Sequence, residues 1–278
     1  MIRRLAYAAA GALAPGPAGR RATDAFSTTR AFGIHPDDLP PLGARTFPVP
    51  GAPRVREGYL WGPDDAPTAL LVHGWGADSS SMHSLIGPLR ALGYRVAAFD
   101  APGHGVSAGT QATMTEYVDA LGAVLDTLGP VRAAVAHSLG SIVTAAALAG
   151  RPHQRIDSLT LVAPTRTLGG VLDRWATGRL PTRTADLIRA ELHRRNGVPV
   201  THWDLLPHGR RLTAPVLVVA DPHDPVVPFA EAETIAAGLP RARLRSVPGS
   251  GHLGILMAAE TKETTAAFVA EHAEENVL

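Results

Sequence analysis

The sequence predicts an α/β fold in which helices cover both faces of a parallel sheet. Two patterns support this prediction. Short, continuously apolar runs recur along the chain and end at Gly, Pro or Asp, as buried parallel strands do. Segments with apolar residues at helical spacing separate many of these runs, which is typical of a parallel sheet. The chain has 278 residues, 45% of them hydrophobic, which is enough for one large domain or two small ones.

Residues 1–53 are expected to form an N-terminal arm, helical at first and then irregular. The stretch "MIRRLAYAAAGALAPGPAGRRA" (1–22) has the outline of a signal peptide, with two arginines before a short apolar run. That run, 5–14, is mostly alanine and too short to span a bilayer. Its best cleavage site directly precedes Pro15. We therefore expect a retained arm and a cytoplasmic protein, with export by this segment as the alternative.

Strands and helices are predicted from the pattern of apolar residues and turn residues. The predicted strands are 46–49, 56–62, 68–74, 95–100, 132–138, 158–164, 215–221 and 242–249. The predicted helices are 79–93, 115–129, 139–150 and 254–272. This order implies that the carboxyl ends of the parallel strands meet along one edge of the sheet.

The segment 165–211 interrupts the alternation with about 47 residues that contain no predicted strand, too many for a plain crossover. We predict that this insertion is a short helical cap over the carboxyl edge of a core formed by 54–164 and 212–278. It holds nine arginines and four acidic residues. This excess of positive charge indicates either a solvated surface or an entrance that attracts anionic substrates, such as phosphate-bearing acyl carriers.

Reactive side chains follow the predicted strands at the edge where ligands bind in open parallel sheets. These residues are His73, Trp75, Asp100, His104, Ser138, Asp221, Asp224 and His252. A serine, an acid and a histidine therefore share one edge, in that chain order.

A serine hydroxyl becomes a good nucleophile only when a neighbouring imidazole takes its proton and a carboxylate orients that imidazole. Ser138, His252 and one of the two aspartates can supply these groups. Backbone N–H groups of Trp75 and Leu139, in the turns "HGWG" and "HSLG", can supply the donors that a developing oxyanion needs.

Five stretches in this order resemble motifs of the α/β-hydrolase superfamily, over residues 56–272. They are "HGWG" (73–76), "DAPGHGVS" (100–107), "AHSLG" (136–140), "DPHDPVVP" (221–228) and "GSGHLG" (249–254). The third is similar to the nucleophile elbow G-x-S-x-G, except that Ala136 replaces the first glycine and adds one methyl group. The resemblance implies the α/β-hydrolase fold, with a mostly parallel sheet of eight strands.

The resemblance also implies a role for each residue of the predicted site. Ser138 is the nucleophile and His252 the general base. Asp224 is the acid because it directly precedes "PVVP", which leaves Asp221 to cap or brace the same loop. Asp100 and His104 are expected to hold the turn after their strand. Candidates for the substrate pocket are His73, His137, Trp175 and Trp203, although His73 can instead brace the oxyanion turn and His137 can be a packing residue.

The predicted function is that of a serine hydrolase that cleaves a carboxylic ester, lactone or thioester through an acyl-enzyme on Ser138. The alternatives are a cofactor-free acyltransferase, a cyclising biosynthetic enzyme or a haloperoxidase-like protein on the same fold, and a non-catalytic ligand-binding protein.

We expect no cofactor and no metal, because the chain lacks cysteine and has no H-E-x-x-H motif. The expected partner is a small acyl substrate, since a net charge of +1 favours neither nucleic acid nor an anionic membrane. The oligomeric state stays open.

Overall fold

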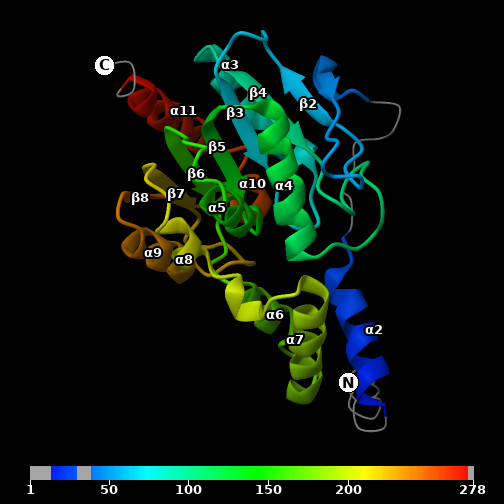
Figure 1. Ribbon diagram of the computed structural model, residues 1–278. Helices are drawn as coiled ribbons and strands as arrows, with labels where there is room; N and C mark the ends of the chain where they lie inside the picture. The colour runs from blue at the N-terminus through cyan, green and yellow to red at the C-terminus, as the bar shows by residue number, and fades with distance from the viewer. Residues whose placement is uncertain (1–13, 30–38, 275–278) are drawn as a thin grey trace.

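An eight-stranded, mostly parallel sheet lies at the centre of the molecule, with helices on both faces (Figure 1). The computed structural model describes residues 14–29 and 39–274. The strand order is β1-β2-β4-β3-β5-β6-β7-β8, in which β1 and β2 are antiparallel to their neighbours and the later pairs are parallel. This arrangement confirms the predicted fold class. The signal-like run predicted at 5–14 falls almost entirely outside the described residues.

The strands are short, as their apolar runs predict. They are β1 (Arg45–Phe47), β2 (Gly58–Trp61), β3 (Thr68–Val72), β4 (Arg95–Phe99), β5 (Val131–His137), β6 (Ser158–Val162), β7 (Val216–Ala220) and β8 (Ala242–Ser246). The α-helices are α2 (Pro15–Ser27), α3 (Ile86–Ala91), α4 (Met114–Leu128), α5 (Gly140–Ala149), α6 (Leu168–Ala176), α7 (Thr182–Asn196), α8 (Leu205–Gly209), α9 (Phe229–Gly238), α10 (Gly251–Gly254) and α11 (Ala259–Glu274). Three 3₁₀-helices join them: η2 (Pro41–Gly43), η3 (Ser79–Leu85) and η4 (Val200–His202).

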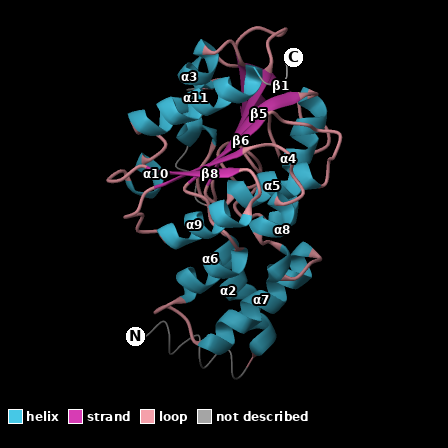
Figure 2. Ribbon diagram, turned by 90° about the vertical axis from the view of Figure 1, so that its left-hand side faces the viewer, coloured by secondary structure: helices cyan, strands magenta, loops and turns pink. Residues whose placement is uncertain are grey.

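Side chains alternate across the sheet, so each central strand contributes to two hydrophobic layers. In β5, Ala134 and Ala136 belong to the layer under α4 and α5, whereas Ala133 and Val135 belong to the layer under α3 and α11. Figure 2 shows α3 and α11 on one side of the strands and α4 and α5 on the other. Because both faces are covered, the strands are continuously apolar instead of alternating with polar residues.

Two predicted helices differ in detail from the structure. Residues 79–93 form η3 and then α3, because the Ser80 and Ser81 side chains hydrogen-bond to Asp78 and Pro88 has no backbone N–H to donate. The predicted helix 254–272 is divided into α10 and α11. In addition, α9 was not predicted, although it connects β7 to β8 as a crossover helix.

The described part of the N-terminal arm begins with α2, in a stretch where the sequence indicated mainly irregular chain. Proline is tolerated in the first turn, and small buried residues then face α7. A Cβ at Gly19 would lie 3.1 Å from the Leu187 Cβ, so the two helices approach closely. Asp24 pairs with Arg195 of α7 at 2.7 Å. A tertiary partner, more than local propensity, therefore stabilises this helix.

The insertion (165–211) contains α6, α7, η4 and α8, and its two ends lie together. Thr167 and Asp204 form an isolated bridge between them. Glu231 of α9 accepts a hydrogen bond from the backbone N–H of Arg166 at 2.6 Å and pairs with Arg174 of α6. Both views show α2, α6 and α7 as a helical group beside the sheet (Figures 1 and 2). Among residues 14–29 and 39–274, no helix is long and apolar enough to cross a bilayer.

Candidate active site

Ser138 lies in a sharp turn between β5 and α5. Its φ is 51°, in the left-handed region that residues other than glycine rarely adopt. The turn requires a glycine two residues later, because a Cβ at Gly140 would lie 2.4 Å from the carbonyl oxygen of His73. The methyl group of Ala136 is fully buried within β5. The one departure from the elbow pattern is therefore accommodated inside the sheet.

Ser138, His252 and Asp224 form one connected hydrogen-bonded row. The Ser138 Oγ lies 2.9 Å from His252 Nε2, and His252 Nδ1 lies 2.7 Å from Asp224 Oδ2. An ionised carboxylate can only accept, so Nδ1 carries the proton and donates it to Asp224. Nε2 is then free to accept the hydrogen bond from the Ser138 hydroxyl. This is the protonation state in which a histidine can act as a general base.

Asp224 is held by donors on both of its oxygens. Its Oδ1 accepts backbone N–H groups from Val226 at 2.7 Å and from Val227 at 3.0 Å, which leaves Oδ2 for His252. Burial acts to raise the pKa of Asp224, but these hydrogen bonds outweigh it and hold the pKa below the usual value for aspartate. Asp224 is therefore ionised at neutral pH and its orientation is fixed.

Asp221 has a different set of partners. Its Oδ1 accepts the N–H of His223, and its Oδ2 accepts the N–H groups of Ser250 at 2.7 Å and Gly251 at 2.6 Å. Burial acts to raise the pKa of Asp221 too, and the backbone donors again lower it. Asp221 thus connects the loop 221–228 to the loop that carries the histidine, and it makes no hydrogen bond to the imidazole.

The predicted oxyanion donors lie beside Ser138. Leu139 follows it directly, and a Cβ at Gly74 would lie 3.0 Å from the Ser138 Cβ, so the turn containing Trp75 packs against the elbow. Within the described part of the chain, the backbone N–H groups of Trp75 and Leu139 have no hydrogen-bond partner. Unpaired donors beside a serine oxygen are available to bind the carbonyl oxygen of an ester.

His73 braces that turn from inside the protein. Its Nδ1 donates to the Gly74 carbonyl at 2.7 Å, and its Nε2 accepts a hydrogen bond from the Ala101 N–H at 3.0 Å. The Tyr117 hydroxyl donates to the backbone carbonyl of His73 at 2.7 Å. Burial lowers the pKa of His73, so the ring is neutral. Because His73 is fully buried, it is not a pocket residue, and only its bracing role agrees with the structure.

His137 is likewise buried, and it supports His252 instead of lining a pocket. Its Nε2 donates to the backbone carbonyl of His252 at 2.9 Å, and the two rings lie 4.9 Å apart. Burial and the neighbouring His252 lower the pKa of His137 to about 3. A neutral imidazole therefore holds the histidine loop in place. No pattern in the sequence marks this contact, because the two residues are far apart along the chain.

A cavity of about 830 Å³ opens beside the elbow, between α2, α4 and the insertion. Trp175, one of the pocket candidates, lines this cavity together with Leu139 and Trp75. Phe26 of α2 also lines it and was missed. No motif in the sequence marks Phe26, since only the docking of α2 on the insertion brings it to the cavity.

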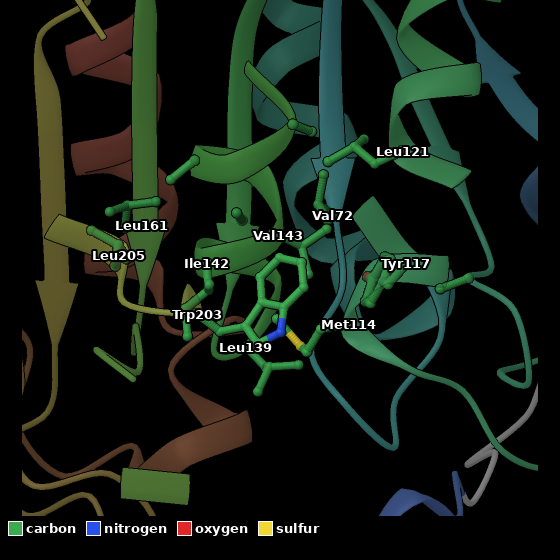
Figure 3. Close-up of a cluster of buried hydrophobic side chains, with 14 of the residues drawn as sticks. Val72, Met114, Tyr117, Leu121, Leu139, Ile142, Val143, Leu161, Trp203 and Leu205 are labelled. Carbon is green, nitrogen blue, oxygen red and sulfur yellow. The ribbon is translucent and has the colours of Figure 1, made fainter. Parts of the chain in front are cut away.

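Trp203 is a core residue and does not line this cavity. Only 3% of its surface is exposed. Figure 3 shows its indole ring packed beside Met114 and Leu139, which themselves line the cavity. Trp203 is therefore buried in the apolar core and packs against residues that form the pocket wall.

Local ion pairs neutralise part of the charge of the insertion. Five of its nine arginines pair with acidic side chains: Arg166, Arg174, Arg189, Arg194 and Arg195. Arg179 is the one charged side chain among the described residues that line the cavity, and it is exposed. Across the same described residues, no group of three or more His, Cys, Asp or Glu is placed to hold a metal ion.

Comparisons with known proteins agree with this architecture. Residues 69–267 match the alpha/beta hydrolase family. Over 108 residues the chain is 34% identical to the bifunctional esterase/perhydrolase DCH of Acinetobacter calcoaceticus, a match that covers 37% of this chain and 38% of that protein. The fold is similar to Est1E from Butyrivibrio proteoclasticus, solved with ferulic acid bound, with a TM-score of 0.64 and 19% identity over 84% of this chain and 99% of that one. It is also similar to the thioesterase domain of the curacin biosynthetic pathway, with a TM-score of 0.58 and 17% identity over 81% and 98% of the two chains. Since the family match extends over most of its length, the chain belongs to the alpha/beta hydrolase family.

Proposed function

We propose that this protein is a serine hydrolase that cleaves a carboxylic ester, lactone or thioester through an acyl-enzyme on Ser138. The observation that carries the proposal is the connected row of Ser138, His252 and Asp224, with contacts of 2.9 Å and 2.7 Å. The strained φ of Ser138 adds to it, because strained backbone is concentrated at functional sites. A helix-capping serine would need neither the imidazole nor the strain.

The proposed reaction has two halves. In the first, Ser138 Oγ attacks the substrate carbonyl while His252 Nε2 takes the hydroxyl proton. The N–H groups of Trp75 and Leu139 bind the oxyanion, and Asp224 stabilises the imidazolium. His252 then passes the proton to the leaving group as the bond to it breaks. In the second half, His252 deprotonates a water molecule that attacks the acyl-enzyme, which releases the acid and regenerates the Ser138 hydroxyl.

We further propose that the insertion and α2 act together as the cap over this site. The core, 54–164 and 212–278, carries Ser138, Asp224 and His252, whereas the insertion and α2 contribute much of the cavity wall. Glu231 connects the two parts, since it accepts from Arg166 and pairs with Arg174.

Labelling with a fluorophosphonate probe tests the nucleophile. We expect wild-type protein to be labelled and Ser138→Ala to be unlabelled, with turnover of short p-nitrophenyl esters reduced about 10⁴-fold or more. Ser141→Ala is the matched control, because it removes a buried hydroxyl three residues further along the same turn and helix. Equal labelling of wild type and Ser138→Ala, or no labelling of either, would contradict the proposal and favour a ligand-binding protein. Acyl-thioesters assayed in parallel separate esterase from thioesterase activity.

Perhydrolysis is a second candidate, favoured by the similarity to a protein described as a bifunctional esterase/perhydrolase. In this reaction hydrogen peroxide replaces water in the second half, so that the acyl-enzyme yields a peroxy acid and the free Ser138 hydroxyl. Formation of peracid from an ester and peroxide, lost in Ser138→Ala, would establish it. Ester hydrolysis without peracid would limit the activity to hydrolysis.

A further inference from the structure

The main cavity runs outward from the elbow along α6. Leu168, Val171 and Trp175 line it with the spacing i, i+3 and i+7, so one face of the helix forms a wall. Seven residues at about 1.5 Å each make this wall about 10 Å long. Its inner end is near the elbow, because the N–H of Thr165 contacts the Ser138 carbonyl oxygen at 3.5 Å.

Phe26 of the N-terminal helix lies at the outer end of that wall. Its ring meets the Trp175 ring edge-on, with centroids 5.3 Å apart and planes at 72°. Two contacts hold Phe26 in this position. Helix α2 packs on α7, and the Ala112 N–H donates to the carbonyl of Ser27, directly after Phe26, at 3.3 Å. The end of the cavity is therefore built by a segment more than 100 residues away from the elbow in sequence.

The site geometry also indicates which part of an ester enters the cavity. His252 must reach the leaving group to protonate it, so the leaving group lies on the side of the histidine. Among the described residues, none in 221–228 or 249–254 lines the cavity. On the histidine side, Leu253 is half exposed to solvent. The acyl group therefore extends into the cavity, and the leaving group lies outside it, on the side of the histidine.

We propose, resting on the hydrolase function above, that the acyl group is an apolar chain of about eight carbons and that Phe26 limits its length. Each carbon of an extended chain advances about 1.25 Å, from bonds of about 1.5 Å at about 111°, so a 10 Å wall spans about eight. The wall itself is apolar, and the one charged lining residue, Arg179, lies one turn beyond Trp175 and is exposed.

Two ester series of increasing length test the proposal. In p-nitrophenyl alkanoates the acyl chain varies from two to twelve carbons, and in alkyl acetates the alcohol varies over the same range. In the wild type we expect kcat/KM to rise by up to about fourfold per methylene in the first series, reach a maximum near eight carbons and then fall. In the second series we expect less than about a threefold change overall.

Phe26→Ala removes the side chain that ends the cavity, and Phe26→Trp places a larger side chain there, which shortens the cavity. We expect the dodecanoyl-to-octanoyl ratio of kcat/KM to rise at least about tenfold in Phe26→Ala and the maximum to shift to shorter chains in Phe26→Trp. Acetyl ester turnover is measured in each variant to normalise the values for the longer esters, because an acetyl group is too short to reach Phe26. Phe229→Ala is the matched control, since Phe229 is also partly buried against the core but does not line the cavity.

The outcomes separate this proposal from the proposed function. If turnover depends on Ser138 but both Phe26 variants keep the wild-type length profile, or if only the alcohol series is length-dependent, Phe26 does not limit the acyl chain. If no ester or thioester is cleaved, the hydrolase function fails, and calorimetry with octanoate still tests the cavity. We expect octanoate to bind the wild type with a Kd at least about fivefold lower than that of Phe26→Ala. Equal affinities would overturn the proposal.

Discussion

Replacing Asp224 with asparagine should disable the site while leaving the fold intact. The reason lies in the donors around the carboxylate. Asp224 Oδ1 faces the N–H groups of Val226 and Val227, and Oδ2 faces His252. In Asp224→Asn the amide oxygen must face the two N–H groups, because an amide NH₂ in that place would set donor against donor and break both hydrogen bonds. The NH₂ group then points at His252 Nδ1.

The magnitude of the effect follows from the tautomer of the imidazole. With an NH₂ group opposite Nδ1, that nitrogen must accept, and the ring proton moves to Nε2. A protonated Nε2 cannot take the proton of Ser138. In serine proteases the equivalent change lowers kcat about 10⁴-fold, which corresponds to about 5.5 kcal/mol of transition-state stabilisation. We expect a loss of this order for Asp224→Asn, with little change in thermal stability.

Asp221→Asn supplies the comparison, because the hydrogen bonds that Asp221 accepts come from backbone N–H groups and none comes from the His252 ring. It should lower the free energy of unfolding by about 1–3 kcal/mol through the loosened contact to Ser250 and Gly251, with a fall in kcat/KM of about tenfold or less. The assay is p-nitrophenyl acetate hydrolysis at pH 7.5, with thermal melting of each variant. The reasoning is refuted if folded Asp224→Asn keeps more than about a tenth of wild-type kcat/KM, or if Asp221→Asn loses more activity than Asp224→Asn.

Three further changes test the packing around the site. Gly140→Ala should destabilise the protein by about 3 kcal/mol in urea unfolding, because its Cβ would lie 2.4 Å from a backbone carbonyl; an unchanged midpoint would contradict the close approach. Glu231→Gln should lower the free energy of unfolding by about 2 kcal/mol and expose the insertion to proteolysis, since Arg174 loses its charged partner. Unaltered cleavage would show that this pair does not anchor the insertion. Burial lowers the pKa of His104 and of His137 to about 3, so both rings stay neutral in the folded protein. The free energy of unfolding is therefore highest above about pH 6.5 and falls as the pH drops towards 3, because only the unfolded chain takes up these protons. Urea titrations should give a slope of about 1.4 kcal/mol per pH unit for each histidine below pH 6, and a flat profile between pH 6 and 4 would argue against neutral burial.

Local sequence determined where the strands lie along the chain and which candidate residues follow them. Buried parallel strands are continuously apolar, so their positions are visible without any tertiary information. The elbow was visible too, because Ser138 follows a buried strand and "AHSLG" resembles the nucleophile elbow. The split of 79–93 into η3 and α3 was not visible, because hydrogen bonds from serine side chains to Asp78 compete with the helical pattern.

The family resemblance implied different roles for Asp221 and Asp224, and only the tertiary structure gave the physical reason for the difference. Asp221 and Asp224 lie three residues apart on one loop, and the donors that separate them come partly from residues 250–252. His137 was a pocket candidate because it adjoins Ser138, yet the fold buries it against the His252 loop. Phe26 carried no signal, although the docking of α2 places it in the cavity wall. A strand or a turn depends on neighbours in sequence, whereas a cavity and a hydrogen-bond partner depend on segments that only folding brings together.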